Sequence, residues 1–416
     1  MSDYARDPTP IAEHVPADSA RAPGGGAAEV LWVFLKLGLT SFGGPIAHLG
    51  YFRNELVVRR KWIGEDEYAD LVALCQFLPG PASSQVGFAL GLLRGGPLGA
   101  LAAWMAFTLP SAAMLLVFGL WAGVAGGTLG LALIHSLKIV AVAVVAQAVW
   151  GMARTLAPDK TRSLIALAGM LIVITAATAI GQITAIAAGA LAGLSFCRGL
   201  PGAPLSGHLH FRISKSAGIV ALVAFAGLLV VPPLMVDATG SHGTALFASF
   251  YRSGALVFGG GHVVLPLLRA AVVDSGWVSS DSFLAGYGFA QAVPGPLFTF
   301  AAYLGAADHL APGGILGAGI ALVAIFLPGL LLLVGTLPFW DSFRTLPSAQ
   351  AAMRGANAAV VGILGAALYD PVWTSAIQGP KDFALAASGF VLLTAWKAPP
   401  WIIVALMAIS GMLLKL

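Results

Sequence analysis

Long apolar segments, divided by short polar stretches, follow one another from residue 28 to the end of the chain. The segments lie at 28–50, 67–93, 98–124, 128–153, 163–179, 181–196, 217–236, 244–268, 280–307, 313–337, 349–369, 383–396 and 399–416. A helix that crosses a bilayer needs about 20 apolar residues, so several of these segments can span a membrane. The shorter pair within 163–196 is expected to form one tight helical hairpin. The pattern therefore predicts an all-α integral membrane protein.

The composition points to the same class of protein. Of the 416 residues, 58% are hydrophobic and 10% are charged, whereas soluble proteins carry about 25% charged residues. So few charges cannot cover a solvated surface, and most of the surface is expected to face the lipid bilayer. The net charge of +4 is small and the basic residues are scattered, which argues against nucleic acid as a partner. Residues 1–26 are polar and are expected to form a disordered tail.

Motifs that would indicate an enzyme or a cofactor are missing from the sequence. There is no P-loop, no HExxH and no Gly-x-Ser-x-Gly. The two cysteines, Cys75 and Cys197, form no CxxC pair and have no partner at metal-ligand spacing. We therefore expect no cofactor, no metal site and no catalytic residues.

The chain contains an internal duplication, which appears when the sequence is shifted by 216 positions and, after a one-residue gap, by 215. The matches fall on Gly, Pro, Trp and charged residues: Gly38 with Gly254, Arg53 with Arg269, Trp62 with Trp277, Asp66 with Asp281, and further on Leu109-Pro110 with Leu327-Pro328 and Lys138 with Arg354. Convergent apolar composition would not match these rarer residues. We expect a first repeat at 27–200, a linker with an extra helix at 201–240, and a second repeat at 241–416.

The distribution of basic residues predicts that the two repeats have opposite orientations. Basic residues gather in 53–61, 154–162 and 198–215, which places these loops in the cytoplasm. The equivalent loops of the second half lose this bias, as an inverted repeat requires. Both flanks of 67–93 then lie inside, so this segment is expected to be a re-entrant hairpin. A parallel arrangement, in which 28–50 is a true span, is the alternative.

Four breaks rich in glycine and proline interrupt the apolar segments, two in each half. They are Phe42-Gly43-Gly44-Pro45 and Pro79-Gly80-Pro81, followed by Phe258-Gly259-Gly260-Gly261 and Pro294-Gly295-Pro296. Each break begins a new helix whose first amides carry partial positive charge. The hydroxyls of Ser83, Ser84 and Thr299 follow at helix-start positions. Four such N-termini meeting at a pseudo-two-fold axis would form an anion site. The alternative is that these residues only kink packed helices.

Basic side chains inside apolar segments are further candidates. Lys36 and its counterpart Arg252 lie within two turns of the Phe-Gly-Gly breaks, and Lys138 and Arg354 form a second duplicated pair. A cation near the bilayer centre costs about 2.5–3.5 kcal/mol on the insertion scale. Lys36 and Arg252 are therefore interpreted as neutralising a bound dianion, with snorkelling to the headgroups as the alternative.

Uncharged polar residues complete the set of candidates. Gln76 and Gln291 precede each Pro-Gly-Pro by three residues, and Gln85 follows the first one. Their amides can donate to an oxyanion, although interhelical hydrogen bonding is the alternative. His48 and His262 are not in register and are interpreted as packing or hydrogen-bonded residues rather than proton carriers. Carboxylates are nearly absent from the apolar segments, which argues against a cation as substrate.

These motifs resemble the chromate ion transporter superfamily in its long two-domain form. The resemblance is carried by FLKLGLTSFGGPIAHLGYFRNELVVRRKWI at 34–63, QFLPGPASSQ at 76–85, and GALVFGGGHVVLPLL and QAVPGP in the second half. It covers nearly the whole chain after the tail. The second-half break is Gly-Gly-Gly where the first has Gly-Gly-Pro, so the two halves are expected to contribute unequally.

The resemblance implies a secondary transporter that exports chromate from the bacterial cytoplasm across the inner membrane and confers chromate resistance. A sulfate transporter for uptake or exchange is the first alternative, because the two ions are chemically similar. An integral membrane oxidoreductase is an alternative of another class, although no cofactor motif supports it. The expected partners are a chromate or sulfate oxyanion and the lipid bilayer, and assembly as a homodimer is left open.

Overall fold

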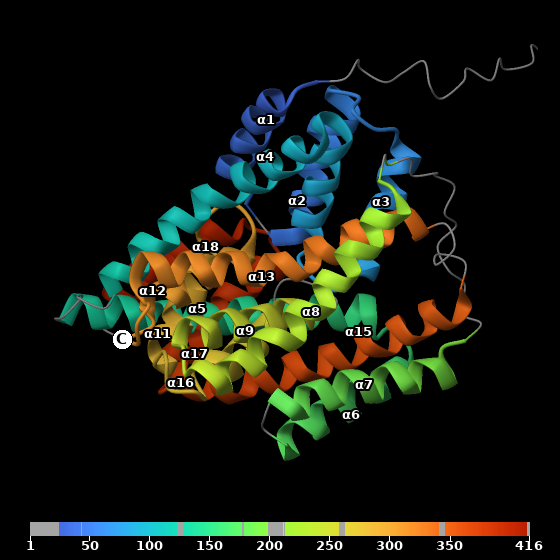
Figure 1. Ribbon diagram of the computed structural model, residues 1–416. Helices are drawn as coiled ribbons and strands as arrows, with labels where there is room; N and C mark the ends of the chain where they lie inside the picture. The colour runs from blue at the N-terminus through green and yellow to red at the C-terminus, as the bar shows by residue number, and fades with distance from the viewer. Residues whose placement is uncertain are drawn as a thin grey trace, which may run out of the picture.

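The computed structural model describes residues 25–42, 44–122, 128–176, 179–198, 211, 213–257, 263–340 and 346–413. Every secondary-structure element in these ranges is helical, as the apolar pattern predicts (Figure 1). The first half contains α1 (Ala27–Thr40), α2 (Gly44–Phe52), the π-helix η2 (Arg53–Arg59), α3 (Glu65–Phe77), α4 (Ala82–Ala122), α5 (Thr128–Leu156), α6 (Lys160–Thr175) and α7 (Ala179–Phe196). The predicted tail lies outside the described residues, apart from Gly25 and Gly26.

The second half repeats this order after the additional helix α8 (Lys215–Thr239). It contains α9 (His242–Ala255), α10 (Val264–Val272), α11 (Ser280–Ala290), the 3-10 helix η4 (Leu297–Thr299), α12 (Phe300–Ala307), α13 (Gly314–Thr336), the 3-10 helix η5 (Leu337–Phe339), α15 (Pro347–Ala367), the π-helix η6 (Leu368–Trp373), α16 (Thr374–Ala376), α17 (Pro380–Thr394) and α18 (Pro400–Leu413).

Five helices within the described residues are long and apolar enough to cross a membrane. They are Ala82–Trp121, Ala132–Leu156, Lys215–Val236, Gly314–Phe339 and Pro347–Ala376. Among them, α8 is the least buried, and its exposed side chains include Val220, Val223 and Leu234. Large apolar side chains on an outer face are the surface that a lipid environment favours.

Glycine and proline set the helix ends where the sequence predicts breaks. Helix α1 ends at Thr40 and α2 begins at Gly44, whose φ of +77° places it in the left-handed region. Within α4, the backbone is not helical at Gly95 and Gly96, so a kink separates Ala82–Arg94 from Pro97–Ala122. Glycine adopts such dihedral angles readily, and Pro97 has no amide proton to continue the hydrogen-bond ladder.

The duplication is visible in the packing within each half. Gly38 of α1 approaches α4 so closely that an added Cβ would lie 3.0 Å from the Cα of Phe107. In the second half, Gly254 of α9 lies against Ile325 of α13 in the same way. Gly38 and Gly254 are equivalent in the repeat, and so are Phe107 and Ile325. The internal repeat of the sequence is therefore a repeat of structure.

The last two helices of each half pack on a helix of the other half. Helices α6 and α7 lie along α15 (Figure 1), whereas α17 and α18 lie along α5. A Cβ on Gly169 of α6 would lie 3.1 Å from the Cα of Ala359, and a Cβ on Gly389 of α17 would lie 3.1 Å from the Cβ of Ala143. Ala143 and Ala359 are equivalent by the 216-residue shift, and Gly389 lies four residues, about one helical turn, beyond the equivalent of Gly169. Each half therefore places its last two helices on the equivalent helix of the other half.

Candidate functional site

Each Pro-Gly-Pro break is a sharp turn between a short helix and the start of the next helix. Gly80 lies between α3 and α4 with a φ of +119°, and Gly295 lies between α11 and η4 with a φ of +99°. Residues with a Cβ atom are disfavoured at these φ angles, whereas glycine adopts them readily. The arms of each turn pack against one another; in the second half the hydroxyl groups of Ser282 and Tyr303 are 2.7 Å apart.

Two backbone hydrogen bonds join the breaks across the halves. The amide of Gly80 donates to the carbonyl oxygen of Val257 at 2.7 Å, and the amide of Gly295 donates to the carbonyl oxygen of Ser41 at 2.9 Å. Ser41 and Val257 immediately precede the two Phe-Gly-Gly breaks and are equivalent by the 216-residue shift. Each Pro-Gly-Pro break therefore contacts the Phe-Gly-Gly break of the opposite half.

The same two glycines also touch the long helix of the opposite half. A Cβ on Gly80 would lie 2.9 Å from the Cα of Gly329 in α13, and a Cβ on Gly295 would lie 2.8 Å from the hydroxyl oxygen of Ser111 in α4. The side-chain amide of Gln85 donates to the carbonyl oxygens of Pro79 (3.1 Å) and Gly329 (2.9 Å). The breaks are thus held together by close approaches at two glycines and by hydrogen bonds from the side chain of Gln85 to backbone carbonyl oxygens.

Polar side chains are buried around the first-half breaks. Ser83, Ser84 and Gln85, in the first turn of α4, are almost completely buried. His48 of α2 is fully buried, and its Nδ1 lies 3.4 Å from the hydroxyl oxygen of Ser83. The sequence predicts a packing or hydrogen-bonded role for His48, which has no histidine counterpart in register; the structure identifies Ser83 as its side-chain partner.

Several of these buried polar atoms have no hydrogen-bond partner among the described residues. They include the hydroxyl oxygens of Ser41, Ser84 and Thr108, Nε2 of His48 and Oε1 of Gln85. Buried polar groups are almost always hydrogen-bonded, to protein, water or a ligand. Ser41 and Thr108 were not among the sequence candidates, because a single hydroxyl in an apolar segment carries no signal of its own.

Other predicted site residues are placed less centrally. Lys36, Arg252 and Gln76 are exposed, Phe42 lies against Trp401 with ring centroids 5.6 Å apart, and Pro45, Pro79 and Gln291 are half-buried. Thr299 is fully buried, but its hydroxyl already donates to the carbonyl oxygen of Pro296 at 2.7 Å. Pro81, Pro294 and Pro296 are buried at the turns. Gly43, Phe258, Gly259, Gly260 and Gly261 lie outside the described residues.

The second pair of candidate cations does not lie at the breaks. Lys138 is buried and donates to Oδ1 of Asp281 at 2.9 Å, across the boundary between the halves. Its counterpart Arg354 donates to the carbonyl oxygen of Cys197 at 3.2 Å. These two residues connect helices rather than contribute to the cluster of buried polar groups.

The arrangement offers neutral hydrogen-bond donors rather than a catalytic or metal-binding set. In the described part of the chain, no group of three or more His, Cys, Asp or Glu side chains could hold a metal ion. The buried groups near the breaks are hydroxyls, an imidazole and an amide, next to helix N-termini. Such groups can bind an oxyanion without covalent chemistry.

Long apolar helices, an apolar outer face and broken helices that meet across two repeats define a multi-pass membrane protein of the transporter type. The sequence profile of the Chromate transporter family matches residues 28–194 and again residues 244–412. The chain therefore belongs to the chromate transporter family, and it is a transporter rather than an enzyme.

Relatives of full length and of half length support this assignment. The chromate transport protein of Pseudomonas aeruginosa is 29% identical over 90% of this chain and 89% of its own. The probable chromate transport protein of Synechococcus elongatus is 30% identical over 91% and 93%. The uncharacterized transporter YwrA of Bacillus subtilis is 29% identical over 41% of this chain but 96% of its own, so it corresponds to a single half. No solved structure matches this chain.

Proposed function

We propose that the protein is a secondary transporter that exports chromate from the cytoplasm across the bacterial inner membrane and thereby confers chromate resistance. The observation that carries the proposal is the pair of equivalent hydrogen bonds, Gly80 to Val257 and Gly295 to Ser41, which bring the broken helices of both halves together. Transporters bind their substrates at such breaks, between repeats and near the middle of the bilayer. The names of the full-length relatives supply chromate as the substrate.

The chemistry of the breaks suits a tetrahedral dianion. Helix α2 begins at the Phe42-Gly43-Gly44-Pro45 break, and α4 begins immediately after Pro79-Gly80-Pro81. Amides at helix N-termini and buried hydroxyls donate to oxygen atoms that carry negative charge. Gly43 and the break at 258–261 complete the proposed site, with Gln291 as an amide donor. Gln85 borders the site, but its side-chain amide already donates to the carbonyl oxygens of Pro79 and Gly329. Lys36 and Arg252 would attract the ion at longer range.

The lengths of the broken helices support inverted repeats with re-entrant hairpins. Helix α3 has 13 residues, and the part of α4 before its kink is equally short. At 1.5 Å per residue each arm covers about 20 Å, which is less than the roughly 30 Å hydrocarbon core. The two arms therefore enter and leave by the same membrane face. The reversal of basic-residue bias between the halves agrees with opposite orientations.

Chromate accumulation by everted membrane vesicles tests this function. We expect vesicles that contain the protein to accumulate radioactive chromate in a saturable manner, whereas vesicles without it do not. Excess sulfate serves as competitor. Transport of radioactive sulfate but not of chromate, in either direction, would assign the site to a sulfate transporter for uptake or exchange, and movement of neither ion would refute the proposal.

A further inference from the structure

Resting on the proposed oxyanion transport, we propose that the buried imidazole of His48, which contacts Ser83, recognises the transported ion through Nε2, and that the hydroxyl groups which join it in the site come from the first half.

The position of His48 places it among the breaks. It lies in α2, four residues after Gly44, and is fully buried. Its ring stands edge-on to Phe107, with centroids 5.3 Å apart and an interplanar angle of 89°. The carbonyl oxygen of Phe107 lies next to Gly295, since a Cβ on that glycine would be 3.2 Å away. The backbone of Ser41 is a further hydrogen-bond partner of the imidazole. His48 thus adjoins both breaks of its own half and one of the other.

The contact with Ser83 fits the tautomer of the imidazole that carries its proton on Nε2. A neutral imidazole has one nitrogen that donates and one that accepts. Nδ1 of His48 lies 3.4 Å from the hydroxyl oxygen of Ser83, and either group can be the donor. When Ser83 donates to Nδ1, the proton of the ring resides on Nε2. In that tautomer Nε2 is a buried N–H donor, and it has no partner in the described part of the chain.

A buried donor without an acceptor is costly unless a ligand supplies one. An unmade buried hydrogen bond destabilises a protein by about 1–3 kcal/mol. Ser41, Ser84 and Thr108 show the same property, with buried hydroxyl oxygens that lack partners in the described residues. Four such groups on the elements that border the same breaks indicate one polar site that an ion with several oxygen atoms would satisfy.

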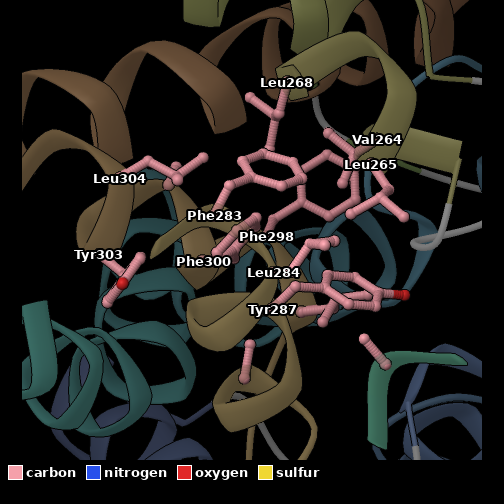
Figure 2. Packing of buried hydrophobic residues seen from close by; sticks show 14 of the residues in the cluster. Val264, Leu265, Leu268, Phe283, Leu284, Tyr287, Phe298, Phe300, Tyr303 and Leu304 are labelled. Atoms are coloured by element: carbon pink, nitrogen blue, oxygen red, sulfur yellow. The ribbon is translucent and has the colours of Figure 1, made fainter. Parts of the chain in front are cut away.

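The second half has lost each of these polar groups. By the repeat register, Ser41 corresponds to Val257, His48 to Val264, Ser83 to Phe298 and Thr108 to Phe326. All four replacements are apolar and buried in one hydrophobic cluster. Figure 2 shows Val264 and Phe298 among the aromatic and aliphatic side chains of α10, α11 and α12. At these four positions the second half keeps the backbone contacts of the breaks but has apolar side chains in place of the hydroxyls and the imidazole. Nε2 of Gln291, next to its Pro-Gly-Pro break, is the second-half side-chain donor that the described residues leave without a partner there.

The remaining pair, Ser84 and Thr299, follows the same rule. Both are hydroxyls and both are buried. The Thr299 hydroxyl is already bonded to Pro296 within its own turn, whereas the Ser84 hydroxyl has no partner among the described residues. Only the first-half member of the pair has its hydrogen-bonding capacity available.

Replacements of His48 distinguish a role in recognising the ion from a role in stabilising the fold. The probe is radioactive chromate, measured as uptake by proteoliposomes that contain the full chain and as the rise in melting temperature that the ion causes. His48→Gln keeps an N–H donor close to the position of Nε2, and His48→Leu removes it. We expect His48→Leu to raise the half-saturating chromate concentration at least about tenfold and His48→Gln to stay within about threefold of wild type. Ser83→Ala should fall between them.

Two readouts decide the outcome. Because the unpartnered donor is costly without the ion, His48→Leu should melt no lower than wild type when chromate is absent, yet lose the rise that chromate causes. The matched second-half variant Val264→Ala should keep the half-saturating concentration of wild type. Unchanged half-saturation in His48→Leu, or equal loss in His48→Leu and His48→Gln with lower melting temperatures, would overturn the inference. A wild-type protein that moves neither chromate nor sulfate would instead overturn the proposed function itself.

Discussion

At the scale of single residues, Gly80 shows how strictly the junction of the breaks limits the sequence. Its φ of +119° is unfavourable for any side chain, and an added Cβ would lie 2.9 Å from the Cα of Gly329. We expect Gly80→Ala to destabilise the protein by about 1–3 kcal/mol, because the backbone is strained and α13 must move. Thermal unfolding of the purified protein in detergent measures this.

Gly227 of α8 provides the control for Gly80. An added Cβ on Gly227 meets no atom within 4 Å, and it lies in a regular helix. Gly227→Ala should therefore leave the melting temperature unchanged or raise it slightly, since alanine favours the helix. Equal melting temperatures for the two variants would show that the tight turn at Gly80 does not hold the halves together.

Residue identity predicted part of the site. Ser83, Ser84 and Gln85 were identified because they follow a Pro-Gly-Pro break, and the structure finds all three buried. Ser41 and Thr108 could not be identified, because isolated hydroxyls in apolar segments commonly bond to their own helix. The exposure of Lys36 was also unpredictable, since a helix with apolar residues on most of its surface does not reveal which face is inward.

At the scale of elements, α15 depends on glycines where α7 crosses it. A Cβ on Gly355 would lie 2.6 Å from the Cα of Gly193 and would also meet the backbone of Gly189. Gly355→Ala should destabilise the protein by about 1–3 kcal/mol, because two backbones must separate. Gly365→Ala on the same helix is the control: its Cβ would meet only the terminal methyl group of Met170, which can move aside.

Thermal unfolding of both α15 variants measures the difference in stability, and a larger loss of stability for Gly365→Ala would contradict this account of the packing.

The sequence predicted that the two halves are equivalent, which the contacts of Gly38 and Gly254 bear out. It could not predict that α6 and α7 pack on α15 of the other half. The alignment of the two repeats identifies equivalent residues, but it does not show whether a residue contacts its own half or the other half.

At the scale of the whole molecule, the two halves differ in one of their contacts with each other. Helix α11 packs along α5, where Asp281 accepts a hydrogen bond from Lys138 at 2.9 Å. The equivalent elements are α3 and α15, with Asp66 and Arg354 in the equivalent positions. Among the described residues, α3 packs on α4 and η2 but has no comparable contact with α15. Asp66 is exposed, and Arg354 donates to the carbonyl oxygen of Cys197.

This asymmetry predicts the second state of the transporter. If the inverted halves exchange conformations during transport, Asp66 should pair with Arg354 when Lys138 releases Asp281. Separating the present pair leaves Lys138 buried without a carboxylate, which is unfavourable unless α11 moves away from it. The two ion pairs should therefore form alternately. In a variant without native cysteines, a thiol-reactive bifunctional reagent, whose spacer matches the length of the ion pair and contains a disulfide, should join Lys138→Cys to Asp281→Cys in one state and Asp66→Cys to Arg354→Cys in the other.

Each cross-link should stop chromate uptake by proteoliposomes, and reduction should restore it, because transport requires both states. The pair Asp66→Cys with Lys138→Cys serves as the control, since neither state joins these two residues. The decisive result is the Asp66 and Arg354 pair, which the present conformation does not bring together. If it never cross-links in a protein that transports chromate, the halves do not exchange conformations. The difference between the two helix pairs, in which α11 contacts α5 but α3 does not contact α15 to a comparable extent, would then be a permanent feature of the fold.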